Sequence, residues 1–369
     1  MVSVRDVAGA ARDYSLADGY LRRGTESGVT ANELTAAAYG SHPLTSTPLT
    51  TDYSGSGRFL SRPGFLSLPE RRQLEWDLMR WHELPAGLPD WLSGGRLDEL
   101  SRAVGKAPGQ AEIACRTMSS PGAPTRLARA DLCHDGAASR LFEYTRTSAP
   151  GGFDNDELTR ALLASPALRE FVAGHALAFP DTLAEIAHTV HAAATARGRD
   201  VGVRPVVALA GWPASSPDLE RRLQYIAGAL CAFGFDAMGC HVGQLDHRPG
   251  DVYLSGRRLD VVYRFFLIED VLGGEQIPDV LEPLVQTHKA GRVFLFAGLD
   301  TEMHGNKRAL GLLSDQQHRG TSTASERPLV DPLLAWTRPL RPGDVEFGGH
   351  LRFDLVQELA KLYRTMAAV

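Results

Sequence analysis

Cysteine is scarce in this sequence, and its spacing does not suit metal binding. The four cysteines form no Cys-x-x-Cys pair of the kind that zinc fingers use. This pattern excludes a zinc-finger type of site and predicts reduced, structural thiols. The cysteines are Cys115, Cys133, Cys231 and Cys240.

Long apolar runs and blocks of like charge are also missing. No apolar run approaches the roughly 20 residues that cross a bilayer, and the N-terminal MVSVRDVAGAARDY lacks the basic-then-apolar pattern of a signal sequence. The net charge of -5 is spread along the chain, which argues against nucleic acid as the main partner. We therefore expect a cytoplasmic protein that binds neither a membrane nor nucleic acid.

The most informative stretch runs from residue 129 to residue 157, RADLCHDGAASRLFEYTRTSAPGGFDNDE. LARADL and SRLFEYT are short apolar-rich runs joined by His-Asp-Gly, a strong hairpin signal because glycine adopts positive φ in a turn. Alternate side chains of a strand share a face, so Arg129 and Asp131 point together, as do Glu143 and Thr145. A cation and two carboxylates are therefore expected to converge on one surface.

The apolar pattern predicts a helical first part followed by alternating strands and helices. LPERRQLEWDLMRWHEL is the clearest amphipathic helix, and DNDELTRALLASPALREFVAG predicts another helix, capped by Asp154 or Asn155. From about residue 200, VRPVVALAGW, the stretch 235–242, VYLSGRRLDVVYRF and RVFLFAG predict strands, with a helix over 217–233. This order favours an α/β layer with parallel strands.

The expected fold class is α/β, with an α+β N-terminal part that contains the antiparallel hairpin, and a parallel-sheet substrate domain. Ligands of such sheets bind beyond the carboxyl ends of the strands, where Trp212, Arg264 and the segment after Ala297 would lie. The predicted units are a mainly helical region 1–105, a hairpin region 106–195 with a metal site and substrate loop, an α/β substrate-binding domain 196–315, and a C-terminal segment 316–369.

The hairpin residues suggest phosphate chemistry. Two close carboxylates beside an arginine suit a magnesium ion that carries phosphate oxygens, because magnesium prefers one or two carboxylates together with phosphate and water. The arginine would complement developing phosphoryl charge. The alternative is a surface hairpin with a salt bridge between Arg129 and Asp131, and the spacing alone leaves both open.

Two further places suit anionic groups. Asn306 and Lys307 follow a glycine at the start of a predicted helix, where backbone donors and a lysine make a phosphate site. A lysine that is simply solvated is the alternative. Arg264 stands where a strand emerges; it could clamp a carboxylate bidentately, or pair with Asp260 or Glu269.

Together these pieces resemble the circularly permuted ATP-grasp ligases, the group that contains glutathionylspermidine synthetase and eukaryotic-type glutathione synthetase. GRRLDVVYRFFLIEDVL, GNKRALGLLSD and ERPLVDPLLAWTRPL also look like segments of that family, so the resemblance covers about residues 110–360. The matching hairpin pieces are Arg129-Ala130-Asp131, then Glu143-Tyr144-Thr145, then the loop Thr147-Ser148-Ala149-Pro150-Gly151-Gly152.

The resemblance implies a ligase that forms an amide bond between a carboxylate and an amine, with ATP and Mg²⁺ as cofactors. ATP would phosphorylate the carboxylate of an amino acid or peptide substrate, and the amine would attack the acyl phosphate. The implied roles are catalysis by Arg129, metal binding by Asp131, Glu143 and Thr145, nucleotide binding by Asn306 and Lys307, and substrate binding by Ser148, Gly151, Gly152 and Arg264.

Two departures from the family pattern bear on activity. The family has Asn where this chain has Thr145, and a hydroxyl is a weaker and shorter metal ligand than an amide carbonyl. The family also continues into a further nucleotide-binding lobe, whereas this sequence stops at Val369. Either a protein partner or oligomer completes the ATP site, or the lobe has been lost or omitted. The competing hypothesis is a non-catalytic binding or scaffolding protein derived from such a ligase. A different enzyme that uses His241 or His304 as a base has no supporting constellation.

Overall fold

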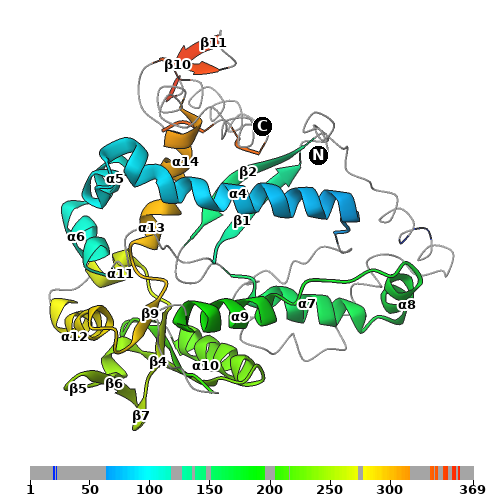
Figure 1. The fold of residues 1–369 in the computed structure, drawn as a ribbon. Coiled ribbons are helices and arrows are strands. Elements are labelled where there is room, and N and C mark those ends of the chain that lie inside the picture. The colour runs from blue at the N-terminus through cyan, green and yellow to red at the C-terminus, as the bar shows by residue number, and fades with distance from the viewer. Residues whose placement is uncertain are drawn as a thin grey trace, which may run out of the picture.

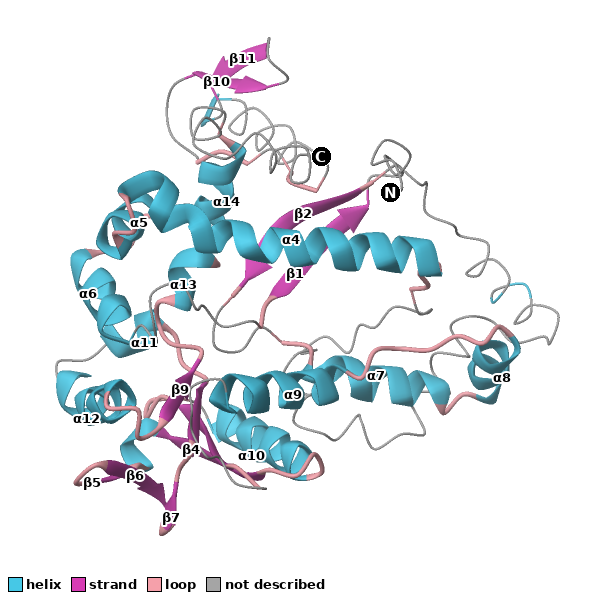
Figure 2. Ribbon diagram, viewed as in Figure 1, coloured by secondary structure: helices cyan, strands magenta, loops and turns pink. Residues whose placement is uncertain are grey.

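The computed structural model shows an α/β fold in which helices join a four-stranded parallel sheet to a separate antiparallel hairpin (Figure 1; Figure 2). Within the part of the chain that the structure describes, no helix is both long and apolar enough to cross a membrane. The described residues are 20, 22, 64–117, 127–134, 138–146, 151–195, 204–215, 217–272, 277–315, 333–335, 337–339, 344–347, 351–354 and 356–357.

The parallel sheet has the strand order β4-β3-β8-β9. Each predicted strand is present, and every neighbouring pair runs parallel. All residues of β8 and β9 are buried, as continuous apolar runs predict for a sheet covered on both faces. The strands are β3 (Val206–Gly211), β4 (Asp236–His241), β8 (Val261–Arg264) and β9 (Phe294–Phe296).

Helices cover both faces of this sheet, because successive strand side chains point to opposite sides. Val207 and Leu209 enter one core, which includes α9 and α10, and Ala208 and Ala210 enter the core on the other side. The ends of the strands are therefore the parts of the sheet that can meet a ligand. The covering helices are α9 (Thr182–Thr195) and α10 (Pro217–Cys231) on the first side, and α5 (Leu97–Ala103), α6 (Pro108–Thr117), α11 (Ile268–Leu272) and α12 (Ile277–Lys289) on the second.

The antiparallel hairpin, β1 (Arg129–His134) and β2 (Ser139–Thr145), packs against the long helix α4 (Leu68–Ser93). Ser67 caps the first turn of α4 with its side chain, and the helix ends at Gly94, whose φ of 59° lies in the left-handed region that glycine adopts freely. The predicted apolar face of this helix is buried beneath the hairpin. Both termini of α4 therefore follow from local sequence, and its orientation follows from packing.

A C-terminal segment closes the outer edge of the hairpin. We call residues 333–335 and 337–339 the strap. The N–H of Leu141 in β2 donates to a strap carbonyl at 2.7 Å, and the next part of the strap hydrogen-bonds to Oγ of Ser314. Ser314 is the last residue of α14 (Lys307–Ser314). The strap thus holds α14 beside β2.

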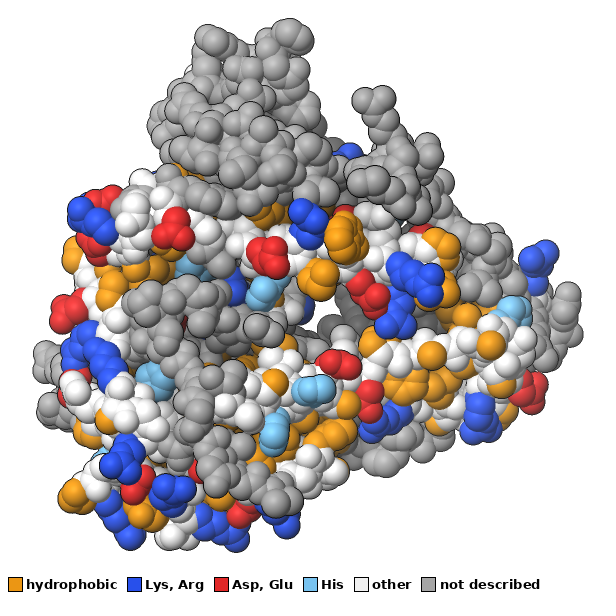
Figure 3. Space-filling model, in the orientation of Figure 1, with side chains coloured by type: hydrophobic (Ala, Val, Ile, Leu, Met, Phe, Trp, Pro, Cys, Tyr) orange, Lys and Arg blue, Asp and Glu red, His pale blue; other side chains and the backbone are white. Residues whose placement is uncertain are grey.

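Two small antiparallel sheets complete the described fold. The predicted hairpin before β8 is present as β6–β7, whereas β5 and the β10–β11 pair were not predicted. The arginines of the first small sheet lie beside aspartates, and Figure 3 shows basic and acidic side chains mixed along this lower edge. The elements are β5 (Asp246–Arg248), β6 (Asp251–Leu254), β7 (Arg257–Arg258), β10 (Asp344–Phe347), β11 (Leu351–Asp354) and a 3-10 turn, Val242–Gln244.

The prediction of a single helix after the hairpin was wrong, because the structure has two helices there. α7 (Phe153–Leu163) begins one residue before Asp154, so neither Asp154 nor Asn155 is its cap. α8 (Pro166–Gly174) follows after a break. Pro166 causes this break because it lacks an N–H group and disfavours helical geometry in the residue before it.

Candidate functional site

The hairpin brings together the four residues that its sequence pattern singles out. β1 and β2 pair so that Arg129 lies opposite Thr145, and Asp131 opposite Glu143. Arg129 donates to Asp131 twice, from Nε to Oδ1 at 2.7 Å and from Nη2 to Oδ2 at 3.1 Å. Its Nη2 also lies 3.9 Å from Oε1 of Glu143. Both the predicted convergence and the Arg129–Asp131 salt bridge are therefore present.

A second cation reaches the same face from α14. Lys307 is the first residue of this helix, and its Nζ lies 2.8 Å from Oε2 of Glu143. The other oxygen of Glu143 lies 3.4 Å from Oγ1 of Thr145, which donates to it. The side chains of Asp131 and Glu143 are 29% and 31% exposed, so solvent reaches both carboxylates. We call Arg129, Asp131, Glu143, Thr145 and Lys307 the hairpin face.

Asn306 determines where α14 begins. Its Oδ1 accepts a hydrogen bond from the backbone N–H of Arg308 at 2.7 Å, which satisfies a donor that would otherwise lack a helical partner. This cap places Lys307 in the first turn of the helix, next to β2. A contact between Asn306 and a nucleotide stays a prediction.

The predicted substrate loop is described only at its end. Ser148 lies outside the described residues. Gly151 and Gly152 have φ values of 87° and 93°, a conformation that residues with a side chain rarely adopt. The backbone path into α7 therefore requires glycine here, and a role of these residues in substrate binding stays a prediction.

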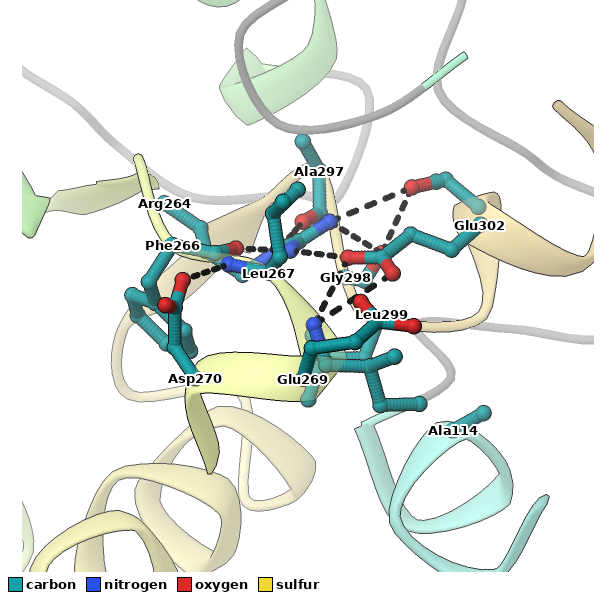
Figure 4. A network of polar contacts seen from close by, with 12 residues as sticks. Ala114, Arg264, Phe266, Leu267, Glu269, Asp270, Ala297, Gly298, Leu299 and Glu302 are labelled. Carbon is teal, nitrogen blue, oxygen red and sulfur yellow. Dashed lines mark hydrogen bonds and ion pairs between the residues drawn. The ribbon is translucent and has the colours of Figure 1, made fainter. Parts of the chain in front are cut away.

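Arg264 lies at the carboxyl end of β8, as predicted, but it is completely buried. Figure 4 shows its guanidinium surrounded by protein acceptors, and a guanidinium has five N–H donors in all. A substrate carboxylate would have to displace one of these acceptors. They are the backbone oxygens of Phe266, Ala297 at 2.5 Å and Gly298 at 3.3 Å, Oγ1 of Thr301 at 3.4 Å and Oε1 of Glu302 at 2.7 Å.

The acidic partner of Arg264 is Glu302, so the alternative prediction of Asp260 or Glu269 was wrong. Glu302 belongs to α13 (Thr301–His304), is 5% exposed, and also lies 3.7 Å from Nζ of Lys106. Burial lowers the pKa of Arg264, and the pairing with Glu302 opposes that shift. Glu302 is 38 residues from Arg264, and no local pattern in the sequence connects the two.

Asp260 and Glu269 have other partners. Asp260 accepts from the backbone N–H of Val206 at 2.9 Å, which ties β8 to the start of β3. Glu269 forms an ion pair with Lys106 at 2.9 Å. Lys106 therefore lies between two carboxylates, one buried and one exposed, and links the α5–α6 connection to the end of the sheet.

Sequence analysis missed a polar cluster beneath the hairpin face. Tyr144 and Arg146 alternate with Glu143 and Thr145 along β2, and both contact His82 of α4. Burial raises the pKa of Tyr144, and burial lowers that of Arg146. The Glu-Tyr-Thr-Arg order was the signal in the sequence, because strand alternation sends Tyr144 and Arg146 to the opposite side.

His304, one of the two histidines considered as a base, lies near this cluster and away from the hairpin face. Its Nδ1 donates to the backbone oxygen of Pro85 at 2.7 Å. Burial, and then the charge of Arg146, lower the pKa of His304 to about 4. His304 is thus a buried neutral group that joins α13 to α4.

The donor set of the hairpin face fits a magnesium ion that is shared with a phosphate. Among the described residues, no group of three or more His, Cys, Asp or Glu side chains is arranged to hold a metal. Asp131 and Glu143 are cross-strand neighbours, whose Cβ atoms are typically about 5 Å apart. Two carboxylates are what magnesium takes when phosphate and water fill its other positions. The arrangement does not fit a metal held by protein alone.

Comparison with known proteins shows a distant similarity in structure alone. No protein-family model matches the chain, and no curated protein matches it. Among solved structures, the chain is similar to a glutathione synthetase-like effector from Globodera pallida in its apo form, with 16% identity and a TM-score of 0.49. The match covers 90% of this chain and 77% of that one. A similarity this distant does not place the chain in a family.

Proposed function

We propose that this chain is an ATP-dependent ligase that joins a carboxylate to an amine, and that the hairpin face holds the magnesium-bound phosphates. The observation that supports this proposal is the convergence of two carboxylates and two cations on one solvent-exposed face. Carboxylates suit the metal and the cations suit phosphate oxygens, so both halves of a metal-phosphate ligand find partners. The reaction class comes from the sequence resemblance to ATP-grasp ligases.

In this proposal Asp131 and Glu143 hold the magnesium ion, with the hydroxyl of Thr145 beside them. The ion, when bound, neutralises negative charge on the phosphates. Arg129 and Lys307 meet the charge on the transferring phosphoryl group. No protein nucleophile is needed, because positioning and electrostatic stabilisation account for most of the catalysis of phosphoryl transfer.

Ligand binding would exchange ion pairs on this face. In the structure Arg129 is bound to Asp131, and Lys307 to Glu143. Asp131 and Glu143 would hold the metal, and Arg129 and Lys307 would then turn from these carboxylates toward the phosphates. The long, exposed side chain of Lys307 can make this movement without any change in the backbone.

The remaining roles are part of the same proposal. An amino acid or peptide would bind with its carboxylate near Ser148, Gly151 and Gly152. Arg264 would contribute only if Glu302 moved away from it. A protein partner or a second copy of the chain would supply further contacts to the nucleotide.

A non-catalytic binding protein is the second candidate, and the surroundings of Arg264 favour it. Five internal acceptors occupy the donors of this arginine. A side chain held in this way stabilises the end of the sheet and offers nothing to a substrate. In this version the hairpin face would bind a phosphorylated ligand without turning it over.

The deciding experiment is a calorimetric titration of the protein with Mg²⁺ and a non-hydrolysable ATP analogue, on wild type, Glu143→Gln and Glu220→Gln. Glu220 is an exposed residue of α10 and serves as the matched control. We expect micromolar, magnesium-dependent binding in wild type and in the control, and loss of binding in Glu143→Gln. ATP consumption with pairs of carboxylates and amines would then separate the ligase from the binding protein.

Two results would overturn the proposal. Equal affinity in wild type and Glu143→Gln would remove the hairpin face as the metal site. If the folded wild-type protein bound no nucleotide, either alone or after addition of cell fractions that contain possible partner proteins, the proposal that it binds ATP would be wrong.

A further inference from the structure

His82 of α4 contacts two residues on the side of the hairpin that faces this helix: Tyr144 of β2, and Arg146, which directly follows the strand. Nδ1 of His82 lies 2.5 Å from the hydroxyl oxygen of Tyr144, and its Nε2 lies 3.2 Å from Nη2 of Arg146. The backbone oxygen of His82 also accepts from Nη1 of Arg146 at 3.4 Å. His82 therefore contacts β2 at both residues that flank Thr145.

The hydrogen-bond partners of the His82 imidazole determine which of its two nitrogens carries the proton. An arginine has only N–H donors, so Nε2 of His82 must accept from Arg146 and carries no proton. The proton of the neutral ring is then on Nδ1, which donates to the oxygen of Tyr144. Arg146 can only donate, whereas the hydroxyl of Tyr144 can accept, so both contacts are satisfied by one neutral tautomer. The ring is thereby held in one tautomer and in one orientation.

The two residues that His82 contacts are buried, whereas Glu143 and Thr145 on the hairpin face are partly exposed. Tyr144 is 3% exposed and Arg146 is 1% exposed. Burial raises the pKa of Tyr144, which keeps its hydroxyl protonated as a hydrogen-bonding group. Leaving either polar group without its partner would be unfavourable, so the contacts with His82 constrain β2 strongly.

Strand geometry passes this constraint to the hairpin face. Successive side chains of a strand point to opposite sides, so the rotation of β2 that places Tyr144 and Arg146 below also places Glu143 and Thr145 above. The pairing of β1 with β2 is irregular next to Asp131, where one residue of β2 has no partner. Such a bulge bends the strand and increases its local twist, so the contacts of Tyr144 and Arg146 with His82 bear on the direction of the neighbouring side chains.

The same end of β2 touches the α13–α14 connection. A side-chain carbon at Gly305 would lie 2.6 Å from the backbone nitrogen of Arg146, so only glycine allows this approach. Lys307 follows two residues later and binds Glu143. The position of Arg146 therefore affects both members of the Lys307–Glu143 pair.

We propose that His82 is a positioning residue for the hairpin face: its two ring contacts fix the rotation of β2 and hold Glu143 and Thr145 toward the ligand. This inference rests on the proposed function of that face for its ligand, a magnesium-bound polyphosphate. His82 contacts Tyr144 and Arg146, whose side chains lie on the opposite side of the strand from those of Glu143 and Thr145. It acts through Tyr144 and Arg146.

The test compares His82→Leu, which removes both polar contacts, with His82→Gln, which retains an acceptor for Arg146. His188→Leu, at an exposed position of α9, is the matched control. The affinity for Mg²⁺ with a non-hydrolysable ATP analogue is expected to fall at least about fivefold in His82→Leu, the loss that follows from a broken buried hydrogen bond. His82→Gln should recover most of it, and the control should match wild type.

A second measurement needs no ligand. Amide hydrogen exchange should become faster over β1 and β2 in His82→Leu, while β3 and β8 keep their protection. If wild type binds no nucleotide, the proposed function fails, and this exchange pattern still decides the role of His82. Unchanged exchange over the hairpin in His82→Leu, or equal affinity in both His82 variants and wild type, would overturn the positioning role.

Discussion

Two strand arginines, one predicted to be catalytic and one predicted to bind substrate, have opposite surroundings. Arg129 lies on the hairpin with its side chain 38% exposed, and it contacts two carboxylates that are also partly exposed. Arg264 is fully buried, and internal acceptors surround its donors. The family resemblance assigned Arg129 to catalysis and Arg264 to substrate binding, and both roles require the guanidinium to reach a ligand. Burial distinguishes them, since an exposed ion pair can exchange partners and a buried one stabilises the fold.

The energies of the two pairs should differ accordingly. An exposed ion pair typically contributes between about 0 and 1 kcal/mol. Removing one partner of a buried pair typically costs about 3–5 kcal/mol, because the other charge is left without compensation. Three predictions test this contrast, in order of decreasing effect on stability.

The largest effect is expected from Glu302→Gln. This change removes the carboxylate charge that pairs with Arg264 and that also lies near Lys106. We expect the free energy of unfolding in urea, followed by circular dichroism, to fall by about 3–5 kcal/mol. Glu143→Gln, the equivalent change on the hairpin face, should lower it by less than about 1 kcal/mol. Equal losses in the two variants would contradict the contrast.

A smaller effect is expected from acid, through His304. Its folded pKa of about 4 lies below the ordinary value of 6.5, so the unfolded state takes up a proton first as the pH falls. The stability contribution of neutral His304 is therefore full above pH 6.5 and declines toward pH 4, by about 3 kcal/mol at most. Urea unfolding at several pH values should show this decline.

His304→Asn is the control for this pH dependence, because it keeps a donor for the backbone oxygen of Pro85 and does not titrate. The variant should have a shallower loss of stability between pH 6.5 and pH 4 than wild type. Parallel pH profiles for the two proteins would show that another group causes the acid sensitivity.

The smallest effect on stability is expected from Lys307→Met. Lys307 is 67% exposed, so loss of its pair with Glu143 should change the free energy of unfolding by less than about 1 kcal/mol. The same change should clearly weaken the binding of a magnesium-bound nucleotide, as measured by calorimetry. Lys289→Met, an exposed lysine on α12, should alter neither property. A large loss of stability in Lys307→Met would show that the Lys307–Glu143 pair stabilises the fold, as the buried Arg264–Glu302 pair does.

The sequence predicted much of the fold and of the hairpin face for clear physical reasons. The parallel strands follow from continuous apolar runs, and the grouping of Arg129, Asp131, Glu143 and Thr145 follows from alternation along two strands joined by a turn. The break before Pro166 was also readable from the rule that proline disfavours the helix before it, although the prediction did not apply it.

Other features depend on contacts between distant segments. Glu302 pairs with Arg264 because α13 reaches the carboxyl end of β8, and His82 meets Tyr144 because α4 lies beneath the hairpin. No periodic pattern links these positions, so local sequence could not reveal them. Lys307 was singled out as a phosphate ligand, but its contact with Glu143 needed the packing of α14 against β2.

The strap has a consequence for how the protein is made. A ribosome releases β2 long before residues 333–335, and at about 5–20 residues per second the delay is on the order of ten seconds or more. Throughout that interval the outer edge of β2 has no strap to pair with at Leu141, and an open strand edge invites mispairing with other chains. The hairpin face is therefore among the last parts of the molecule to mature, and nascent chains should need protection at this edge.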